Sequence, residues 1–237
     1  MTVFIDLDGR GGLQSFGGSA LVSINAWCLK YFGRDALHFA QTLAVRFNGA
    51  RLVLRGIAVD RLFVRTRLLQ AGVNTATFAF RIDPIQQRSH LSWVMLVPAV
   101  RGTKTLKHAL QNLLLAMRDC GTVRLTLQAA LTHGGYVWAT YGFLPETPAE
   151  WTRLSSHLQT KLAVIKNQLS ATELAAIGKI LTSPNPLAIR AVAAIQIPVS
   201  GTTVGKHLLL GTVWNGQLDF SDRPSMLIFL ERIGLIP

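Results

Sequence analysis

The chain has 237 residues, of which 49% are hydrophobic and 15% are charged, and this length suits one large domain or a domain with an appendage. Lysine and arginine number 24 against 12 acidic residues, giving a formal charge of +12, which favours DNA or another polyanion as a partner. The basic residues are scattered, however, so a generally basic solvated surface is an equal alternative to a dedicated nucleic-acid groove. The low charged fraction predicts that other protein subunits cover part of the surface.

The cysteines and the hydropathy pattern exclude several classes. Cys28 and Cys120 are isolated, so neither a disulfide framework nor a zinc site is expected. The histidines have no paired metal spacing, and we expect no metal. The N-terminus lacks a basic segment followed by an apolar core, which predicts a cytoplasmic location in the producing cell. No apolar run approaches the ~20 residues of a membrane span.

Residues 1–34 are rich in glycine and poorly periodic. This composition predicts a loop-rich N-terminal arm that docks on a neighbouring subunit. The glycines concerned are Gly9, Gly11, Gly12, Gly17 and Gly18.

The next residues predict the start of an α/β domain. Helical spacing of apolar residues predicts a helix over 35–47 with Asp35 as its cap. Strands are expected over 51–57 and 75–82. The segment 90–97 is apolar nearly throughout, which predicts a central strand in a mixed sheet with helices on both sides.

A turn and two further helices complete this domain. The pattern predicts a long helix over 104–120 that ends at Gly121, a strand over 123–127, and a short helix over 136–141. Strand, turn, helix, strand and helix in this order indicate an α/β unit with a right-handed crossover.

The character of the chain changes near residue 147. We therefore predict an α/β domain over 35–147 and a mostly helical C-terminal region over 148–237. A small hairpin is expected from 206–210 and 217–220. The expected helices span 149–169, 171–182, 186–195 and 224–233.

Residues 91–145 resemble the GCN5-related N-acetyltransferase (GNAT) family. The resemblance rests on Leu96-Val97-Pro98, Arg101-Gly102, the long helix, and Gly142-Phe143. It implies a GNAT-like mixed sheet flanked by helices. In that family a loop of the form Arg-Gly-x-Gly-x-Gly brings bare backbone N–H groups to the coenzyme A pyrophosphate. The cofactor-binding positions implied for acetyl-CoA are Val97, Arg101, Gly102, Thr103, Lys104 and Thr105.

The chain departs from the family at several positions. Lys104 and Leu106 stand where later glycines are expected, so a loop that merely turns the chain into a helix is the favoured interpretation. Trp138 stands where the family tends to place a tyrosine acid, and an indole is no usable acid at neutral pH. The remaining catalytic candidates are Tyr136, Tyr141 and Asp83. Asp83 has a simpler role as a turn cap before Pro84.

Two other patterns favour structural roles. Residues 201–207 resemble a phosphate-binding P-loop but have the wrong glycine spacing and lack Ser or Thr after Lys206. The tryptophans are spread along the sequence rather than interleaved with basic residues, which argues against a base-stacking platform.

Two functions of different class follow. Residues 205–212 and 214–219 resemble segments that follow such domains in tailed-bacteriophage structural proteins. The first hypothesis is therefore a non-catalytic, acetyltransferase-fold assembly protein without a cofactor, incorporated into a virion. The alternative is an acetyl-CoA-dependent N-acetyltransferase in which Val97 and nearby backbone groups polarise the thioester.

Overall fold

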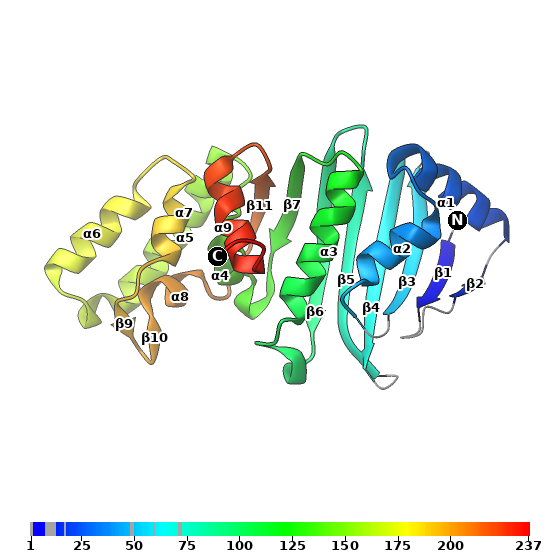
Figure 1. The fold of residues 1–237 in the computed structure, drawn as a ribbon. Helices are drawn as coiled ribbons and strands as arrows, with labels where there is room; N and C mark the ends of the chain where they lie inside the picture. Colours follow the sequence, from blue (N-terminus) through cyan, green and yellow to red (C-terminus); the bar gives the residue numbers. More distant parts are fainter. Residues whose placement is uncertain (1, 8–12, 17, 48–49, 59, 71–72) are drawn as a thin grey trace. The chain divides into compact units, whose positions relative to one another are not determined.

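The computed structural model describes residues 2–7, 13–16, 18–47, 50–58, 60–70 and 73–237 (Figure 1). The chain divides into two compact units, the first comprising Met1–Leu125 with Ile233–Pro237 and the second Thr126–Arg232. Strands and helices occur in both units, which confirms the α/β class. The boundary expected near residue 147 falls inside the second unit, because α4 (Leu131–Thr140) packs against helices α7 and α8 of that unit.

The described strands of the first unit form an antiparallel sheet in the order β2-β1-β3-β4-β5-β6. Three of them confirm the strands predicted over 51–57, 75–82 and 90–97, whereas β4 has no predicted counterpart. Their bounds are β1 (Thr2–Leu7), β2 (Leu13–Phe16), β3 (Ala50–Ala58), β4 (Arg61–Gln70), β5 (Val73–Asp83) and β6 (Arg88–Leu96).

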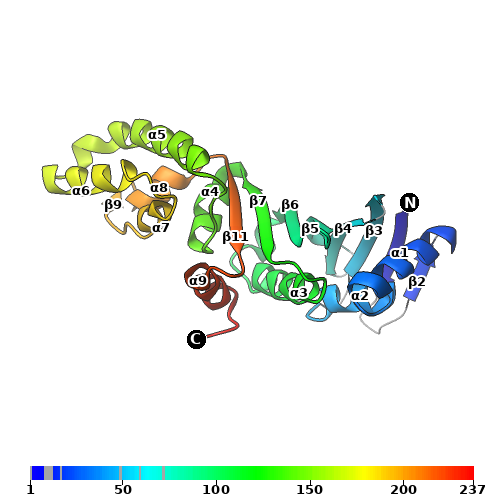
Figure 2. The same ribbon diagram turned by 90° about the horizontal axis from the view of Figure 1, so that it is seen from above.

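Three helices cover one face of this sheet: α1 (Gly18–Tyr31), α2 (Ala36–Ala44) and α3 (Thr105–Asp119). Figure 2 shows them on the same side of β3, β4 and β5. The predicted cap of α2 is confirmed, because the Asp35 carboxylate accepts a hydrogen bond from the His38 N–H at 2.8 Å. Side chains on the covered face are fully buried, including Phe39, Leu52, Leu62, Phe80 and Leu110.

The expectation of helices on both sides is wrong for the strand over 90–97. In β6, Trp93 and Met95 are exposed although they are large and apolar. The apolar side chains of this strand are therefore not evidence of burial on two faces. Among the described residues, helices cover only one face of the sheet of the first unit.

The predicted loop-rich arm is also wrong. β1 pairs with β3 along its whole length, from Thr2 opposite Arg55 to Leu7 opposite Ala50. The following helix α1 buries Trp27 and Cys28 in the first unit. Four of the glycines that suggested a loop lie outside the described residues, and Gly18 begins α1.

The second unit contains a small group of strands and most of its helices. β7 (Arg124–Ala129) begins in the first unit and ends in the second, where β11 (Trp214–Asp219) lies between it and β8 (Leu144–Pro145). The helices are α4, α5 (Pro148–Ile165), α6 (Ala171–Leu181), α7 (Ala188–Ala193), α8 (Val204–Leu209) and α9 (Arg223–Ile233), with short 3-10 turns η1 (Pro98–Val100) in the first unit and η2 (Lys166–Gln168) in the second.

The C-terminal helices predicted from periodicity are confirmed as α5, α6, α7 and α9. The hairpin expected from 206–210 and 217–220 is wrong. Thr203 caps a helix there, accepting a hydrogen bond from the Lys206 N–H, and β11 pairs with β8 instead. A smaller hairpin joins β9 (Pro198–Val199) to β10 (Thr202–Thr203).

Glycines set the close spacing of three helices in the second unit. A Cβ at Gly135 in α4 would lie 2.1 Å from the Thr212 Oγ1 and 2.4 Å from the Leu209 carbonyl oxygen. A Cβ at Gly205 in α8 would lie 2.3 Å from the Val192 carbonyl oxygen. The helices could not approach to these distances with any larger residue at either glycine.

Within the part of the chain that the structure describes, no helix is long and apolar enough to cross a membrane.

Candidate functional site

The predicted cofactor loop lies between the end of β6 and the start of α3. Val97 extends the pairing of β6 with β5 by one residue, because its N–H donates to the Thr75 carbonyl at 3.0 Å. η1 then turns the chain toward Arg101. Val97 and residues 101–105 are thus brought together in one exposed loop that ends in the first turn of α3.

The loop turns at Gly102, the first glycine of the proposed motif. Its φ of +77° is one that residues with a side chain rarely adopt. Arg101 follows the outside of the turn, and its Nε donates to the Leu96 carbonyl at 3.1 Å. The guanidinium therefore contacts its own strand end.

Thr103 links the loop to the helix. Its hydroxyl donates to the Val100 carbonyl at 2.7 Å and lies 2.8 Å from the Thr105 Oγ1. The same oxygen accepts the Thr105 N–H at 3.3 Å. One of the backbone donors that begin α3 is consequently satisfied by the protein itself.

The first turn of α3 is basic. It contains no acidic residue, and Lys104 and Lys107 are exposed. The pKa of His108 is lowered by partial burial and by the positive charges of Arg46 and Lys104. The helix dipole adds positive potential at the same end, so an anion would be favoured over a cation.

Asp83 lies at the other end of the β5–β6 hairpin. In the antiparallel register Asp83 is opposite Arg88, where β6 begins, whereas Ala76 is opposite Leu96, next to the loop. From Thr75 to Asp83 an extended strand covers ~27 Å at ~3.4 Å per residue. As a catalytic candidate for a site at the cofactor loop Asp83 is therefore misplaced, because an antiparallel hairpin separates its turn from its open end.

The predicted structural role of Asp83 is confirmed. Its Oδ1 accepts the Gln86 N–H at 3.0 Å in the turn after Pro84. Its Oδ2 lies 2.8 Å from the Arg61 Nε. Both carboxylate oxygens are therefore used in holding the turn and the neighbouring strand.

Trp138 and Tyr141 belong to an aromatic cluster of the second unit. Trp138 is only 7% exposed, and its ring centroid lies 5.4 Å from that of Phe143 and 6.0 Å from that of Tyr141. Phe229 of α9 adjoins both Tyr141 and Phe143. Burial raises the pKa of Tyr141, which makes it a weaker acid. Tyr136 lies earlier on α4 and is half-buried.

Gly142 has a packing role in this cluster. Its φ is +87°, and a Cβ there would lie 2.7 Å from the Ser225 carbonyl oxygen. The Gly142-Phe143 pair, on which part of the family resemblance rests, thus allows the end of α4 to approach α9 closely.

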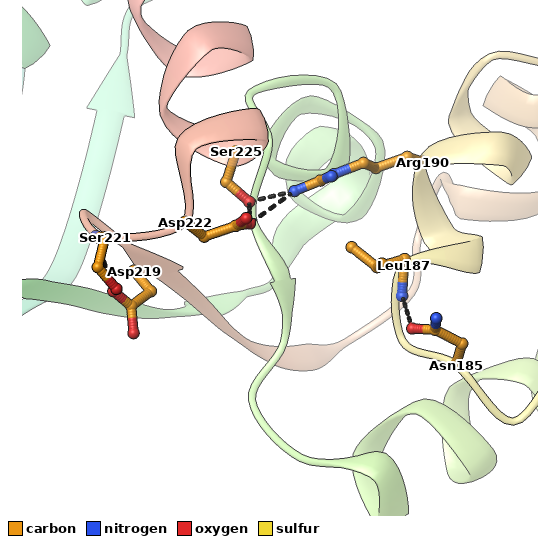
Figure 3. A network of polar contacts seen from close by, with 7 residues as sticks. All are labelled: Asn185, Leu187, Arg190, Asp219, Ser221, Asp222 and Ser225. Carbon is orange, nitrogen blue, oxygen red and sulfur yellow. Dashed lines mark hydrogen bonds and ion pairs between the residues drawn. The ribbon is translucent and has the colours of Figure 1, made fainter.

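A polar network connects α7 with the start of α9 (Figure 3). The Arg190 Nη2 lies 3.1 Å from the Asp222 Oδ2 and also donates to the Ser225 Oγ. Ser225 is 1% exposed and donates to the same carboxylate. These contacts hold α7 against α9. Because Ser225 is almost completely buried, its hydroxyl cannot reach a substrate.

The thiols are not reactive groups. Cys28 and Cys120 are free and buried, and burial raises the pKa of each to about 12. Both therefore remain protonated thiols rather than nucleophilic thiolates. Among the described residues, no group of three or more His, Cys, Asp or Glu is placed to hold a metal ion.

One charged feature was missed in the sequence. In β4, Arg61, Phe63, Arg65 and Arg67 occur at every second position, and this period places them on one face of a strand. The alternation was a usable signal for a strand with one basic face.

Comparison with family models, with curated proteins and with solved structures gave no match to this chain.

Proposed function

We propose that the chain is a non-catalytic protein with an acetyltransferase-like fold that serves as a structural subunit of a larger assembly. Acetyl-CoA-dependent N-acetylation is the second candidate, favoured by the basic first turn of α3. Three features favour the first candidate: the loop over 101–106 carries side chains where glycines are expected, Trp138 is packed among aromatic rings, and α1 exposes apolar residues.

The fold proposal rests on the order of elements around the loop. β6, the turn at Gly102, α3, β7 and α4 follow one another as the family resemblance implies. Val97-Pro98 ends the strand and Arg101-Gly102 leads into the helix.

The groups expected to hold and process acetyl-CoA fit that cofactor poorly. The Thr103 hydroxyl already accepts the Thr105 N–H, and Lys104 and Leu106 bring side chains where bare backbone would meet pyrophosphate. Trp138, at the expected acid position, is packed among aromatic rings. We therefore derive no reaction step through coenzyme A.

The observation that carries the assembly proposal is helix α1. Its inner side buries Ile24, Trp27 and Cys28. Its outer side exposes Val22 and Leu29, which are 69% and 59% exposed, and Lys30 is its only charged residue. Val22 and Leu29 are two turns apart and therefore lie on the same side of the helix, so a partner subunit is expected to cover these exposed apolar side chains.

The proposal that the assembly is a virion rests in addition on the resemblance of residues 205–212 and 214–219 to segments of tailed-bacteriophage structural proteins. In this interpretation the protein is made in the cytoplasm of the producing cell and is then incorporated into a particle. The net charge of +12 would suit a position near packaged DNA.

The test of assembly compares the native mass of three proteins purified from producing cells. Wild type is expected to elute as a complex heavier than the 25.9 kDa chain, whether with copies of itself or with another subunit. The double variant Val22→Glu/Leu29→Glu should elute as a folded monomer, because two carboxylates would have to be buried in the interface.

Val164→Glu on α5 is the matched control. Val164 is 76% exposed but lies outside α1, so this variant should assemble like wild type. A monomeric wild type, or a double variant that assembles normally, would show that α1 is not an assembly surface.

Calorimetry with acetyl-CoA tests the second candidate. We expect a Kd no tighter than about 1 mM for wild type. Lys104→Gly/Leu106→Gly should bind more tightly if the fold proposal is right, because it removes both side chains from the loop. Micromolar binding by wild type together with turnover of an amine would establish the enzyme instead.

A further inference from the structure

The sheet face opposite α1, α2 and α3 is basic and aromatic. Strand alternation places Leu62 and Val64 of β4 in the buried core, and Phe63, Arg65 and Arg67 on the other side. Neighbouring strands add further side chains to this side. The open arginine face, as we call it, consists of Phe63, Arg65, Arg67, Arg81, Trp93 and Met95.

The pairing register brings these residues together across three strands. Arg65 of β4 is opposite Ala79 of β5, which is opposite Trp93 of β6. In the next row, Phe63 is opposite Arg81. Successive rows on one face are ~7 Å apart and neighbouring strands ~5 Å apart, so Phe63 and Arg81 are ~5 Å apart at the backbone and Arg65 and Trp93 ~10 Å. Long arginine and tryptophan side chains can therefore reach the same ligand.

The residues of β5 at the centre of this face have short side chains, which project less far from the sheet than the arginines and Trp93 do. Ala79 lies between Arg65 and Trp93, and Thr77 lies between Arg67 and Met95. Both Ala79 and Thr77 are buried, because the longer side chains on either side cover them. A ligand would therefore meet guanidinium and aromatic groups first.

The cations of this face are available to a ligand. Arg65, Arg67 and Arg81 are exposed, and none of them has an ion pair with a described residue. Asp83, a carboxylate at the edge of the face, is already paired with Arg61.

Of the two aromatic side chains on this face, Phe63 is partly buried and Trp93 is exposed. Trp93 is 50% exposed, although tryptophan side chains are on average largely buried. The Arg65 guanidinium carbon lies 5.8 Å from the centroid of the Phe63 ring. An exposed ring beside free arginines provides a π-face for a base and a cation for a phosphate.

We propose that the open arginine face binds single-stranded nucleic acid. Arg65, Arg67 and Arg81 contact phosphates, and Trp93 and Phe63 stack on unpaired bases. This inference does not depend on the assembly proposal, because it concerns a different face and rests on different residues.

The chemistry favours a single strand over the other polyanions. A duplex hides its base faces within the stack, so Trp93 could not stack on them. A single strand offers an unpaired base next to every phosphate, whereas an acidic protein surface has no such regular alternation of anions and π-faces. Antiparallel sheets that present exposed aromatic residues, with helices on the other side, bind unpaired bases in this manner. Sequence-independent binding is expected, because every base has a π-face.

The experiment measures fluorescence anisotropy of labelled oligo(dT), oligo(rU) and a DNA duplex with the full chain over a range of salt concentrations. Arg65→Ala/Arg67→Ala/Arg81→Ala should weaken single-strand binding at least tenfold near physiological salt. The slope of log affinity against log salt should fall in magnitude by about 2, since each phosphate contact on a single strand contributes ~0.7.

A control variant removes the same charge elsewhere. Lys166→Ala/Lys179→Ala/Arg223→Ala takes three exposed cations from the second unit. It should bind within about twofold of wild type. Equal losses in the two triple variants would contradict the proposal, because only net charge would then matter.

Trp93 tests the stacking part separately. Trp93→Ala should weaken binding about tenfold without changing the salt slope, and Trp93→Phe should retain most of the affinity because a π-face remains. The relative affinities for oligo(dT) and oligo(rU) would identify the preferred strand. Binding that favours the duplex, or that is unaffected by Trp93→Ala, would overturn the proposal and leave a general polyanion surface.

Discussion

Certain arginines of the two units have different surroundings. In the second unit Arg153 pairs with Glu150 and donates to the Val213 carbonyl, and Arg190 clamps α7 to α9. In the first unit, Arg65 and Arg67 of β4 are exposed and have no ion pair with a described residue. The formal charge of +12 therefore does not describe one uniform basic surface, because some of these charges hold helices together while others remain available to a ligand.

Their tryptophans show the same contrast. Trp138, Trp151 and Trp214 of the second unit are all buried, whereas the first unit has both a buried tryptophan, Trp27, and a half-exposed one, Trp93. Burial of an aromatic ring stabilises the fold, and exposure leaves its π-face for recognition. Substitutions in the two units should accordingly separate stability from binding.

The largest effect is expected from deleting residues 1–34. The deletion removes β1 from its pairing with β3 and takes Trp27 and Cys28 out of the core. We expect the first unit to lose its cooperative thermal transition, measured by circular dichroism. A truncated chain that melts like wild type would restore the interpretation of these residues as a docking arm.

Trp138→Ala should cost about 3–5 kcal/mol of unfolding free energy, as is usual when a buried aromatic residue is truncated. Trp93→Ala is its counterpart in the first unit and should cost about 1 kcal/mol or less, because half of that side chain is already in water. Denaturant titration of both variants gives the comparison. Similar losses at the two positions would contradict the proposed division between core and surface.

Periodic patterns allowed much of the fold to be predicted. Helices α2, α5, α6 and α9 were predicted from apolar spacing, with Asp35 as the cap at the start of α2. β4 was not predicted, because its arginines looked like scattered charge until the register placed them on one face. The hairpin over 206–220 was wrong because strand propensity cannot reveal which strand β11 will meet.

The candidate site was predicted only in part. Residues 97–105 do form one loop, because they are contiguous in the sequence. Asp83 was misplaced because its distance from that loop depends on which end of a hairpin it occupies. The interleaving of Arg65 with Trp93 was missed because these residues are adjacent only across β5, and a sequence read along the chain does not show cross-strand neighbours.

Gly135→Ala should cost about 1–3 kcal/mol, the usual range for overpacking, because the new methyl group would lie 2.1 Å from the Thr212 Oγ1. Gly134→Ala is the matched control, since its nearest neighbour would be at an ordinary 3.6 Å. Alanine favours a helix by up to about 1 kcal/mol over glycine, so the control should be neutral or stabilising. Equal behaviour of the two variants in thermal melts would show that α4 and α8 are not held at this spacing.

The smallest effect on stability is expected from Arg65→Ala. A small effect would show that the Arg65 side chain is not needed to hold the first unit together. Arg65 is exposed and contacts only the Phe63 ring among the interactions of the described residues, so its loss should change the unfolding free energy by no more than about 0.5 kcal/mol. Arg190→Ala in the second unit should cost about 1–3 kcal/mol, because it leaves Asp222 without its cation and removes a hydrogen bond to a charged group. Denaturant titration of the two variants measures the difference. If Arg65→Ala were as destabilising as Arg190→Ala, the arginines of β4 would be part of the framework of the first unit, and their exposure would no longer indicate a ligand.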